Sequence, residues 1–172
     1  MNVKIAKNAG FCFGVKRAMN MAWHELEESE NGIYALGPLI HNKQAVSVYE
    51  DKGLMTVNDL DEIPQHEHVI IRSHGVGKNI YLEAKNKNIT VIDTTCPFVT
   101  KIHNLAKDFS DKGYRIIVIG DKNHPEVIGI NGWCSEDAII LKTLEEGKSA
   151  RTLEFNEEEQ VLVKDMFLLT TK

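Results

Sequence analysis

Residues 68–77, HVIIRSHGVG, join a run of apolar residues to a polar loop that contains two glycines. The segment Lys78–Asn86, which has a helix-like pattern, follows the loop, and a second run rich in Val and Ile, Thr90–Ile92, comes next. Short runs rich in β-branched residues and bounded by polar or glycine residues are typical of buried strands. The succession of strand, helix and strand favours a parallel sheet with helical connections.

The same alternation extends in both directions along the chain. Further strands are predicted at Val3–Ala6, Ile33–Leu36, Arg115–Ile119, Ala138–Leu141 and Val161–Lys164. Further helices are predicted at Val15–Glu28, Lys43–Asp51, Val99–Lys112 and Glu126–Trp133, with Gly53, Gly113 and Gly132 where helices are expected to end. The pattern predicts an α/β protein with mostly parallel sheets flanked by helices. We expect two similar small lobes, residues 1–95 and 96–172, with a weaker pattern from about residue 148 onward.

Composition narrows the class of protein. The chain has 172 residues, of which 42% are hydrophobic, and a net charge of −5. A sizeable core is therefore expected, and an acidic balance argues against non-specific binding of nucleic acid. No apolar run approaches the roughly 20 residues needed to cross a bilayer, and the N-terminus does not resemble a signal peptide. Three cysteines do not make a disulfide framework, so we expect a protein of the reducing cytoplasm.

Two of the cysteines, Cys12 and Cys96, each stand in a loop between a predicted strand and a predicted helix. The positive end of a helix dipole favours the thiolate form, and thiolates bind soft metals and iron–sulfur clusters. We therefore predict a shared metal or cluster site; the alternative is that each thiol is a small buried hydrophobic group. Cys134 follows a predicted helix end, and we interpret it as a structural thiol.

Three loops that follow predicted strands each contain a histidine: His41, His74 and His124. Ligands of open α/β sheets bind at the carboxyl ends of strands, and imidazolium beside free helix N–H groups suits phosphate oxygens. This pattern predicts an anion site, with solvated surface histidines as the alternative. Glu126 could act at the same site or be a first-turn helix acid favoured by the dipole. Neither a P-loop nor a GxGxxG motif is present, so a nucleotide is not indicated.

The remaining histidines show no such context. We expect them to be ordinary solvated or hydrogen-bonded surface residues: His24, His66, His68 and His103.

Five strings occur in order along the chain: AGFCFGVKRA (9–18), LGPLIHN (36–42), RSHGVG (72–77), DTTCPFVTKIH (93–103) and GDKNHPEVIGINGW (120–133). Together they resemble the 4-hydroxy-3-methylbut-2-enyl diphosphate reductase family, also called LytB. The resemblance implies an architecture of three α/β lobes around an iron–sulfur cluster, expected to be of the 4Fe-4S type. It also implies reductive dehydroxylation of an allylic diphosphate to isopentenyl and dimethylallyl diphosphate, in the methylerythritol phosphate route of isoprenoid biosynthesis.

The resemblance assigns roles residue by residue. Cys12 and Cys96 match two of the three cysteine ligands of the cluster. His41, His74 and His124 match the histidines around the diphosphate, and Glu126 matches the acid that relays protons to the substrate. Thr170 matches a threonine that contacts the substrate. A ferredoxin or flavodoxin is implied as electron donor.

The third lobe of the family, with the third cysteine ligand, has no counterpart in this sequence. We therefore expect a cluster held by two cysteines to be poorly protected, and turnover by this chain to be in question. An apolar surface left uncovered would favour self-association.

Two other hypotheses remain open from the sequence. One is a non-catalytic module that binds diphosphate or a metal through His41, His74 and His124. The other is a zinc site formed by Cys12, Cys96 and a histidine, although no CxxC or HxxxH spacing supports it.

Overall fold

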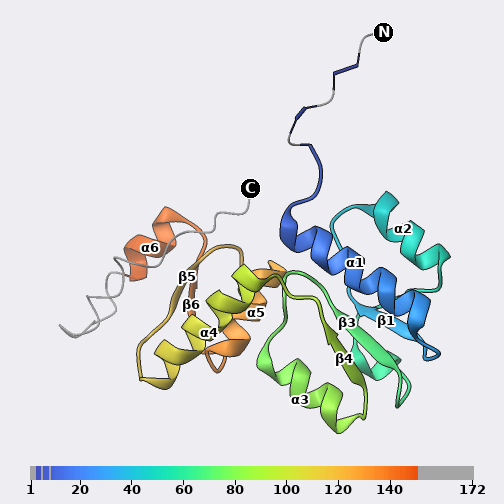
Figure 1. The fold of residues 1–172 in the computed structure, drawn as a ribbon. Helices are drawn as coiled ribbons and strands as arrows, with labels where there is room; N and C mark the ends of the chain where they lie inside the picture. Colours follow the sequence, from blue (N-terminus) through green and yellow to red (C-terminus); the bar gives the residue numbers. More distant parts are fainter. Residues whose placement is uncertain (1–2, 5, 8, 151–172) are drawn as a thin grey trace. The chain divides into compact units, whose positions relative to one another are not determined.

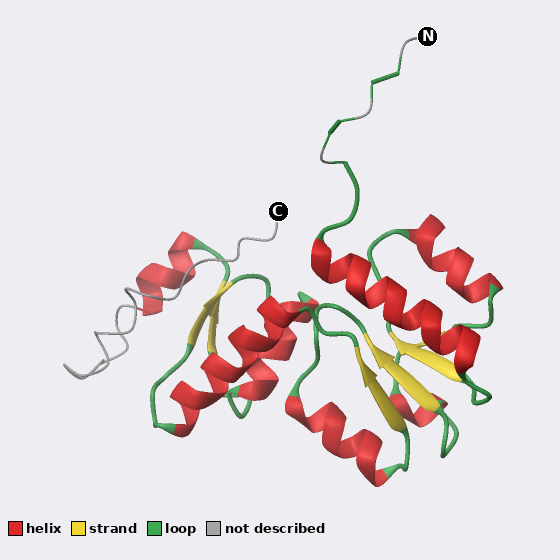
Figure 2. Ribbon diagram, in the orientation of Figure 1, coloured by secondary structure: helices red, strands yellow, loops and turns green. Residues whose placement is uncertain are grey.

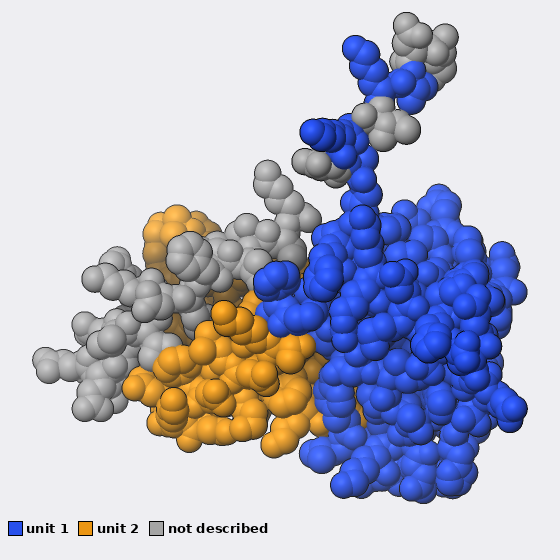
Figure 3. All heavy atoms as spheres, in the orientation of Figure 1, with its two compact units in different colours: residues 1–75, 81–99 blue, residues 76–80, 100–172 orange. Residues whose placement is uncertain are grey.

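The structure is a computed structural model that describes residues 3–4, 6–7 and 9–150 (Figure 1). By its contacts the chain forms two compact units (Figure 3). The first unit comprises Met1–Gly75 and Tyr81–Val99, and the second comprises Val76–Ile80 and Thr100–Lys172. The predicted lobes, 1–95 and 96–172, remain a prediction. The sequence did not indicate that the two units exchange a segment: residues 76–80 lie between the two parts of the first unit in the sequence but belong to the second unit.

The first unit is built on a four-stranded parallel sheet with the strand order β2-β1-β3-β4. Its strands are β1 (Ile33–Leu36), β2 (Met55–Val57), β3 (His68–Ile71) and β4 (Thr90–Asp93). The connections contain α2 (Lys43–Asp51), the 3-10 helix η1 (Leu60–Glu62) and α3 (Lys78–Asn86), and α1 (Phe13–Glu28) precedes β1. Parallel neighbours need such crossovers, which is why strands and helices alternate along the chain. Figure 2 shows the strands side by side, with α1 along the sheet.

The core of the first unit lies between one face of this sheet and the helices α1 and α2. Ala35 of β1 and Ile70 of β3 are register partners on that face, and both are fully buried. Ala22 of α1 and Val46 and Tyr49 of α2 belong to the same buried cluster. The Tyr49 hydroxyl donates a hydrogen bond to the carbonyl of Met19 at 3.2 Å, so that the buried phenol is satisfied.

The second unit contains a parallel pair of strands, β5 (Ile117–Ile119) and β6 (Ile139–Leu141). Its helices are α4 (Pro97–Asp111), α5 (Pro125–Trp133) and α6 (Leu144–Ala150), of which α4 begins in the first unit. Ala106, Val118 and Val127 form the buried core together with Cys134. The fold class is therefore confirmed: both described sheets are parallel and connected through helices. No helix in the described part of the chain has the length and apolar character that crossing a membrane would require.

Several predicted elements differ from the observed ones. Val3–Ala6 is not a strand at the residues that the structure describes there, and the side chain of Val3 is 75% exposed. A strand needs a neighbour for its backbone groups, and an apolar run does not reveal whether one is present. The short strand β2 and the helix α6 were not predicted. Gly53 and Gly113 do follow helix ends with positive φ, whereas Gly132 lies inside α5. The predicted strand Val161–Lys164 lies outside the described residues.

Candidate functional site

Cys12 lies at the N-terminus of α1, as the N-cap residue of that helix. Its backbone is extended, with φ −65° and ψ 168°, and its carbonyl accepts the first helical hydrogen bond, from the Lys16 N–H at 3.0 Å. The residue is exposed, and its side chain makes no capping hydrogen bond. The thiol is thus available at the positive end of a 16-residue helix.

Cys96 lies directly before Pro97, the first residue of α4, and its side chain lies against the first turn of α1. A Cβ atom built on Gly14 would be 2.5 Å from Sγ of Cys96 and 3.0 Å from its Cβ. Gly14 is only two positions after Cys12. The structure therefore brings the Cys96 thiol to the first turn of the helix that Cys12 caps.

The loop that carries Cys96 is held by hydrogen bonds on both sides. The Cys96 N–H donates to the carbonyl of Ser73 at 3.0 Å, and the buried Thr94 hydroxyl donates to the carbonyl of Ile71 at 2.6 Å. From the opposite side, Nη1 of Arg17 donates to the carbonyl of Thr95 at 3.2 Å. The backbone position of Cys96 is therefore fixed both by the end of β3 and by α1.

His41 and His74 lie next to each other at the carboxyl ends of β1 and β3. Their ring centroids are 4.8 Å apart, with an angle of 52° between the ring planes. His41 is exposed and directly precedes Asn42, whose Oδ1 caps α2 by accepting from the Ala45 N–H at 2.9 Å. Two imidazoles in ring contact beside a helix N-terminus provide donors suited to an anion.

His124 and Glu126 lie in the second unit, at the start of α5. His124 is the N-cap residue, and its Nδ1 accepts a hydrogen bond from the Glu126 N–H at 3.3 Å. With Nδ1 as acceptor, a neutral ring carries its proton on Nε2 and can donate from that side. Pro125 at the first helical position and Glu126 in the first turn are both typical of a helix start.

The predicted site residues thus divide between the two units. The first unit brings together Cys12 with Cys96, and His41 with His74. The second unit contains His124 and Glu126. Thr170 lies outside the described residues.

Cys134 is buried in the core of the second unit. Its exposed fraction is 1%, and it packs with Ala106, Ile116, Val118 and Val127. Burial raises the pKa of this thiol to about 11, so it stays protonated at neutral pH. A buried, protonated thiol is a poor metal ligand, which supports its interpretation as a structural residue.

His103 is buried on α4, and its ring stacks on Trp133 at 5.8 Å between centroids. This burial corrects the expectation that His103 is a surface residue, because its ring packs on Trp133 and does not face solvent.

Sequence reasoning did not single out Gly14 and Arg17, which hold the Cys96 loop against α1. Their signal was present in the string AGFCFGVKRA, where a glycine occupies the second position of a helix. Glycine is unfavourable in helices, so a glycine there is consistent with a close neighbour, although Gly147 in α6 shows that a helical glycine need not have one.

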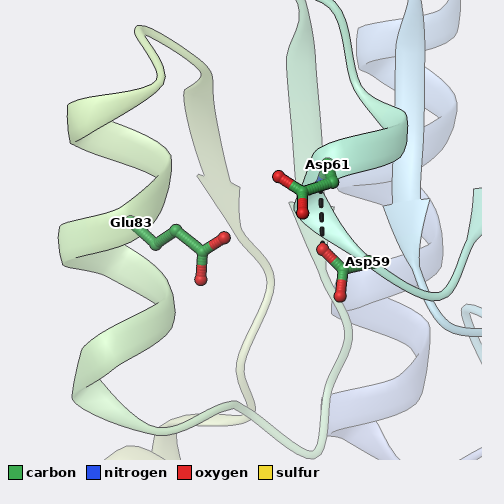
Figure 4. Close-up of side chains that lie close together, drawn as sticks. All are labelled: Asp59, Asp61 and Glu83. Carbon is green, nitrogen blue, oxygen red and sulfur yellow. Dashed lines mark hydrogen bonds between the residues drawn. The ribbon is translucent and has the colours of Figure 1, made fainter.

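An acidic cluster, Asp59, Asp61 and Glu83, is the one group of possible metal-ligating side chains of this kind among the described residues (Figure 4). Asp59 caps η1 by accepting from the Asp61 N–H at 2.9 Å. Lys87 pairs with Asp61, and its Nζ lies 3.9 Å from Glu83. Capping and this lysine account for the cluster without a metal ion.

Comparison with known proteins identifies relatives of this chain. The model of the LytB protein family matches residues 3–170. A 4-hydroxy-3-methylbut-2-enyl diphosphate reductase of Clostridioides difficile is 70% identical over 146 residues, which cover 85% of this chain and 52% of the relative. A reductase of the same name from Caldanaerobacter subterraneus is 45% identical over 152 residues.

Two solved structures are also similar. The E-1-hydroxy-2-methyl-but-2-enyl-4-diphosphate reductase of Plasmodium falciparum superimposes with a TM-score of 0.81 at 31% identity, over 87% of this chain and 46% of that one. A structure of (E)-4-hydroxy-3-methyl-but-2-enyl diphosphate reductase, described as the terminal enzyme of the non-mevalonate pathway, gives a TM-score of 0.74 at 38% identity. This chain spans about half the length of the curated relatives it matches.

Proposed function

Since this chain belongs to the LytB family, we propose that it carries part of the machinery of a 4-hydroxy-3-methylbut-2-enyl diphosphate reductase. The reaction is a reductive dehydroxylation: the C–O bond of an allylic alcohol is cleaved, two electrons and two protons enter, and water leaves. The products are isopentenyl and dimethylallyl diphosphate. The observation that carries the proposal is the approach of the Cys96 thiol to the first turn of the helix capped by Cys12.

The thiols fit an iron–sulfur cluster by their chemistry and their place. Cys12 is exposed at a helix N-terminus and Cys96 is half-buried against the same helix turn, whereas the third cysteine is a core residue. We propose Cys12 and Cys96 as two ligands of a 4Fe-4S cluster. Such a cluster, when bound, supplies the electrons and a Lewis-acidic iron for the leaving oxygen.

The remaining proposed roles concern the substrate. His41, His74 and His124 are each proposed as contacts of the diphosphate, so that binding energy remote from the reacting carbon positions it. Glu126 delivers a proton to the departing hydroxyl, which then leaves as water. Thr170 is proposed as a further substrate contact. Electrons are proposed to come from a ferredoxin or flavodoxin.

Iron content tests the cluster assignment. We would measure iron and acid-labile sulfide per chain, with the visible spectrum, in anaerobically purified protein and in three variants: Cys12→Ser, Cys96→Ser and Cys134→Ser. The first two are expected to lose iron and the charge-transfer absorbance, while Cys134→Ser, the matched control, keeps both. Loss of iron only in Cys134→Ser would overturn the assignment, and a colourless protein containing zinc would favour the zinc site.

Binding of inorganic diphosphate to the cluster-free protein tests the anion site. Replacing His41 or His74 by Ala is expected to weaken binding, whereas His24→Ala, an exposed histidine on α1, is the control. Diphosphate binding without any iron or turnover would favour the non-catalytic module.

Measuring the turnover rate distinguishes the proposed catalytic role of Glu126 from a role in binding. Glu126→Gln is expected to keep iron content and diphosphate affinity but to lower the turnover rate by roughly 10²–10⁴-fold, as removal of a general acid does. A variant with unchanged turnover would remove Glu126 from the mechanism.

Self-association is a separate proposal. Phe13 and Phe98, which lie close in sequence to the two thiols, are 64% and 69% exposed. Exposed aromatic side chains favour association, so light scattering is expected to give a mass above that of a monomer.

A further inference from the structure

We propose that Gly14 is a positioning residue for the Cys96 thiol: its missing side chain makes the room in which Sγ lies against the first turn of α1. The proposal rests on the proposed function insofar as Cys96 is a cluster ligand. The steric relation between the two residues stands on the geometry alone.

The contact is too close for any side chain at position 14. A Cβ atom there would lie 2.5 Å from Sγ of Cys96 and 3.0 Å from its Cβ, and real Cβ atoms essentially never approach other heavy atoms to less than 3.0 Å. Gly14 has no positive φ, so its backbone conformation is open to alanine. Space, and not backbone conformation, is therefore the reason for glycine at this position.

Cys96 cannot move away as a whole. Its N–H is bonded to the carbonyl of Ser73, and the preceding residue, Thr95, is bonded to Arg17 of α1 itself. A methyl group at position 14 must therefore turn Sγ to another rotamer or separate the loop from α1. In either case the thiol leaves the helix turn that also presents Cys12. A displaced ligand costs metal affinity even when the ligand itself is retained.

The matched control is Gly147→Ala. Gly147 also lies in a helix, α6, and a Cβ atom there would meet nothing within 4 Å. Both variants replace a helical glycine by alanine, so they share the propensity effect, and only Gly14→Ala adds a contact with a thiol.

The experiment combines a thermal double-mutant cycle with iron analysis. Melting temperatures are measured for the full chain with Gly14→Ala, with Cys96→Gly, which removes both close side-chain atoms, and with the two together. Gly14→Ala is expected to lower the melting temperature in the parent chain but not in the Cys96→Gly background. Equal lowering in both backgrounds, or no lowering in either, would overturn the proposal. If Gly14→Ala alone fails to fold, the double variant decides: recovery of folding supports the proposal, and continued failure refutes it.

Iron and sulfide per chain give the second readout. At limiting iron, Gly14→Ala is expected to bind iron about 10- to 100-fold more weakly than the parent, while Gly147→Ala binds as the parent does. Unchanged iron affinity in Gly14→Ala would show that Gly14 does not position the ligand. If the parent itself binds no iron, the proposed function fails, and the thermal cycle still tests the Gly14–Cys96 relation on its own.

Discussion

The buried thiol of Cys134 makes the stability of the second unit depend on pH in the alkaline range. Burial raises its pKa from 9.0 to about 11 in the folded protein. At pH 10, about nine-tenths of the Cys134 thiols are therefore ionised in the unfolded chain, but only about one-tenth in the folded protein. This difference lowers the free energy of unfolding at pH 10 by about 1.4 kcal/mol. The sign follows from proton binding: the folded state holds the proton more tightly, so stability falls as the pH rises from 9 towards 11.

The assay is urea unfolding at pH 7.5 and pH 10 under reducing conditions. Trp133, next to Cys134, reports on this unit by fluorescence once the other tryptophan is removed by Trp23→Phe. Other groups also titrate over this range, so the same measurement on Cys134→Ala supplies the correction. That variant loses some packing at every pH but has no thiol to ionise.

The parent is expected to lose about 1.4 kcal/mol more than Cys134→Ala between the two pH values. Equal losses in the two proteins would refute the reasoning, because they would mean that the thiol ionises as easily in the folded state as in the unfolded chain. Rapid alkylation of Cys134 in the native protein at pH 8 would contradict it independently.

Three further substitutions test the packing that positions the candidate site, each by urea unfolding followed by circular dichroism. Asn42→Ala removes the cap of α2 and is expected to cost about 1 kcal/mol, whereas Asn42→Asp should retain most of the stability. Trp133→Phe removes the hydrogen bond from Nε1 to the carbonyl of Val76 and is expected to cost about 1 kcal/mol, and no change would mean that water replaces it. Ile70→Ala, in the fully buried centre of the first unit, is expected to cost about 2–5 kcal/mol; a smaller loss than from Ile70→Val would contradict the assigned burial.

The two inner strands, β1 and β3, could be predicted because each is a nearly continuous apolar run with no exposed residue, which is the pattern of a parallel sheet covered by helices. The edge strand β4 has no buried residue, and it was predicted from its apolar pair Val91 and Ile92. The edge strand β2 was missed although two of its three residues, Met55 and Val57, are apolar, because three residues are too few to show a strand period. At Val3–Ala6 a strand was predicted but is not observed: this run is also rich in Val and Ile, yet its described residues do not form a strand.

The sequence allowed us to predict which loops carry the candidate site residues, but not which residues of those loops contact one another. Strand ends and helix starts can be located locally, and they placed His41 and His74 at one edge of the sheet. Gly14 and Cys96 are 82 positions apart in the sequence, and nothing in the residues around either one indicates that they lie in contact. Gly132 was expected to end α5, yet it lies within the helix. The close backbone of Gly77 explains the glycine there, because a Cβ atom on Gly132 would be 2.6 Å from Cα of Gly77.

The packing of residues 76–80 with the second unit has a consequence for any attempt to divide the protein. No continuous stretch of the gene encodes either unit. A fragment ending at residue 99 would carry Gly77 away from Gly132, and a fragment starting at residue 100 would leave the Trp133 indole without the Val76 carbonyl. Gene duplication, domain shuffling or expression of fragments can therefore keep the two units intact only by retaining them together.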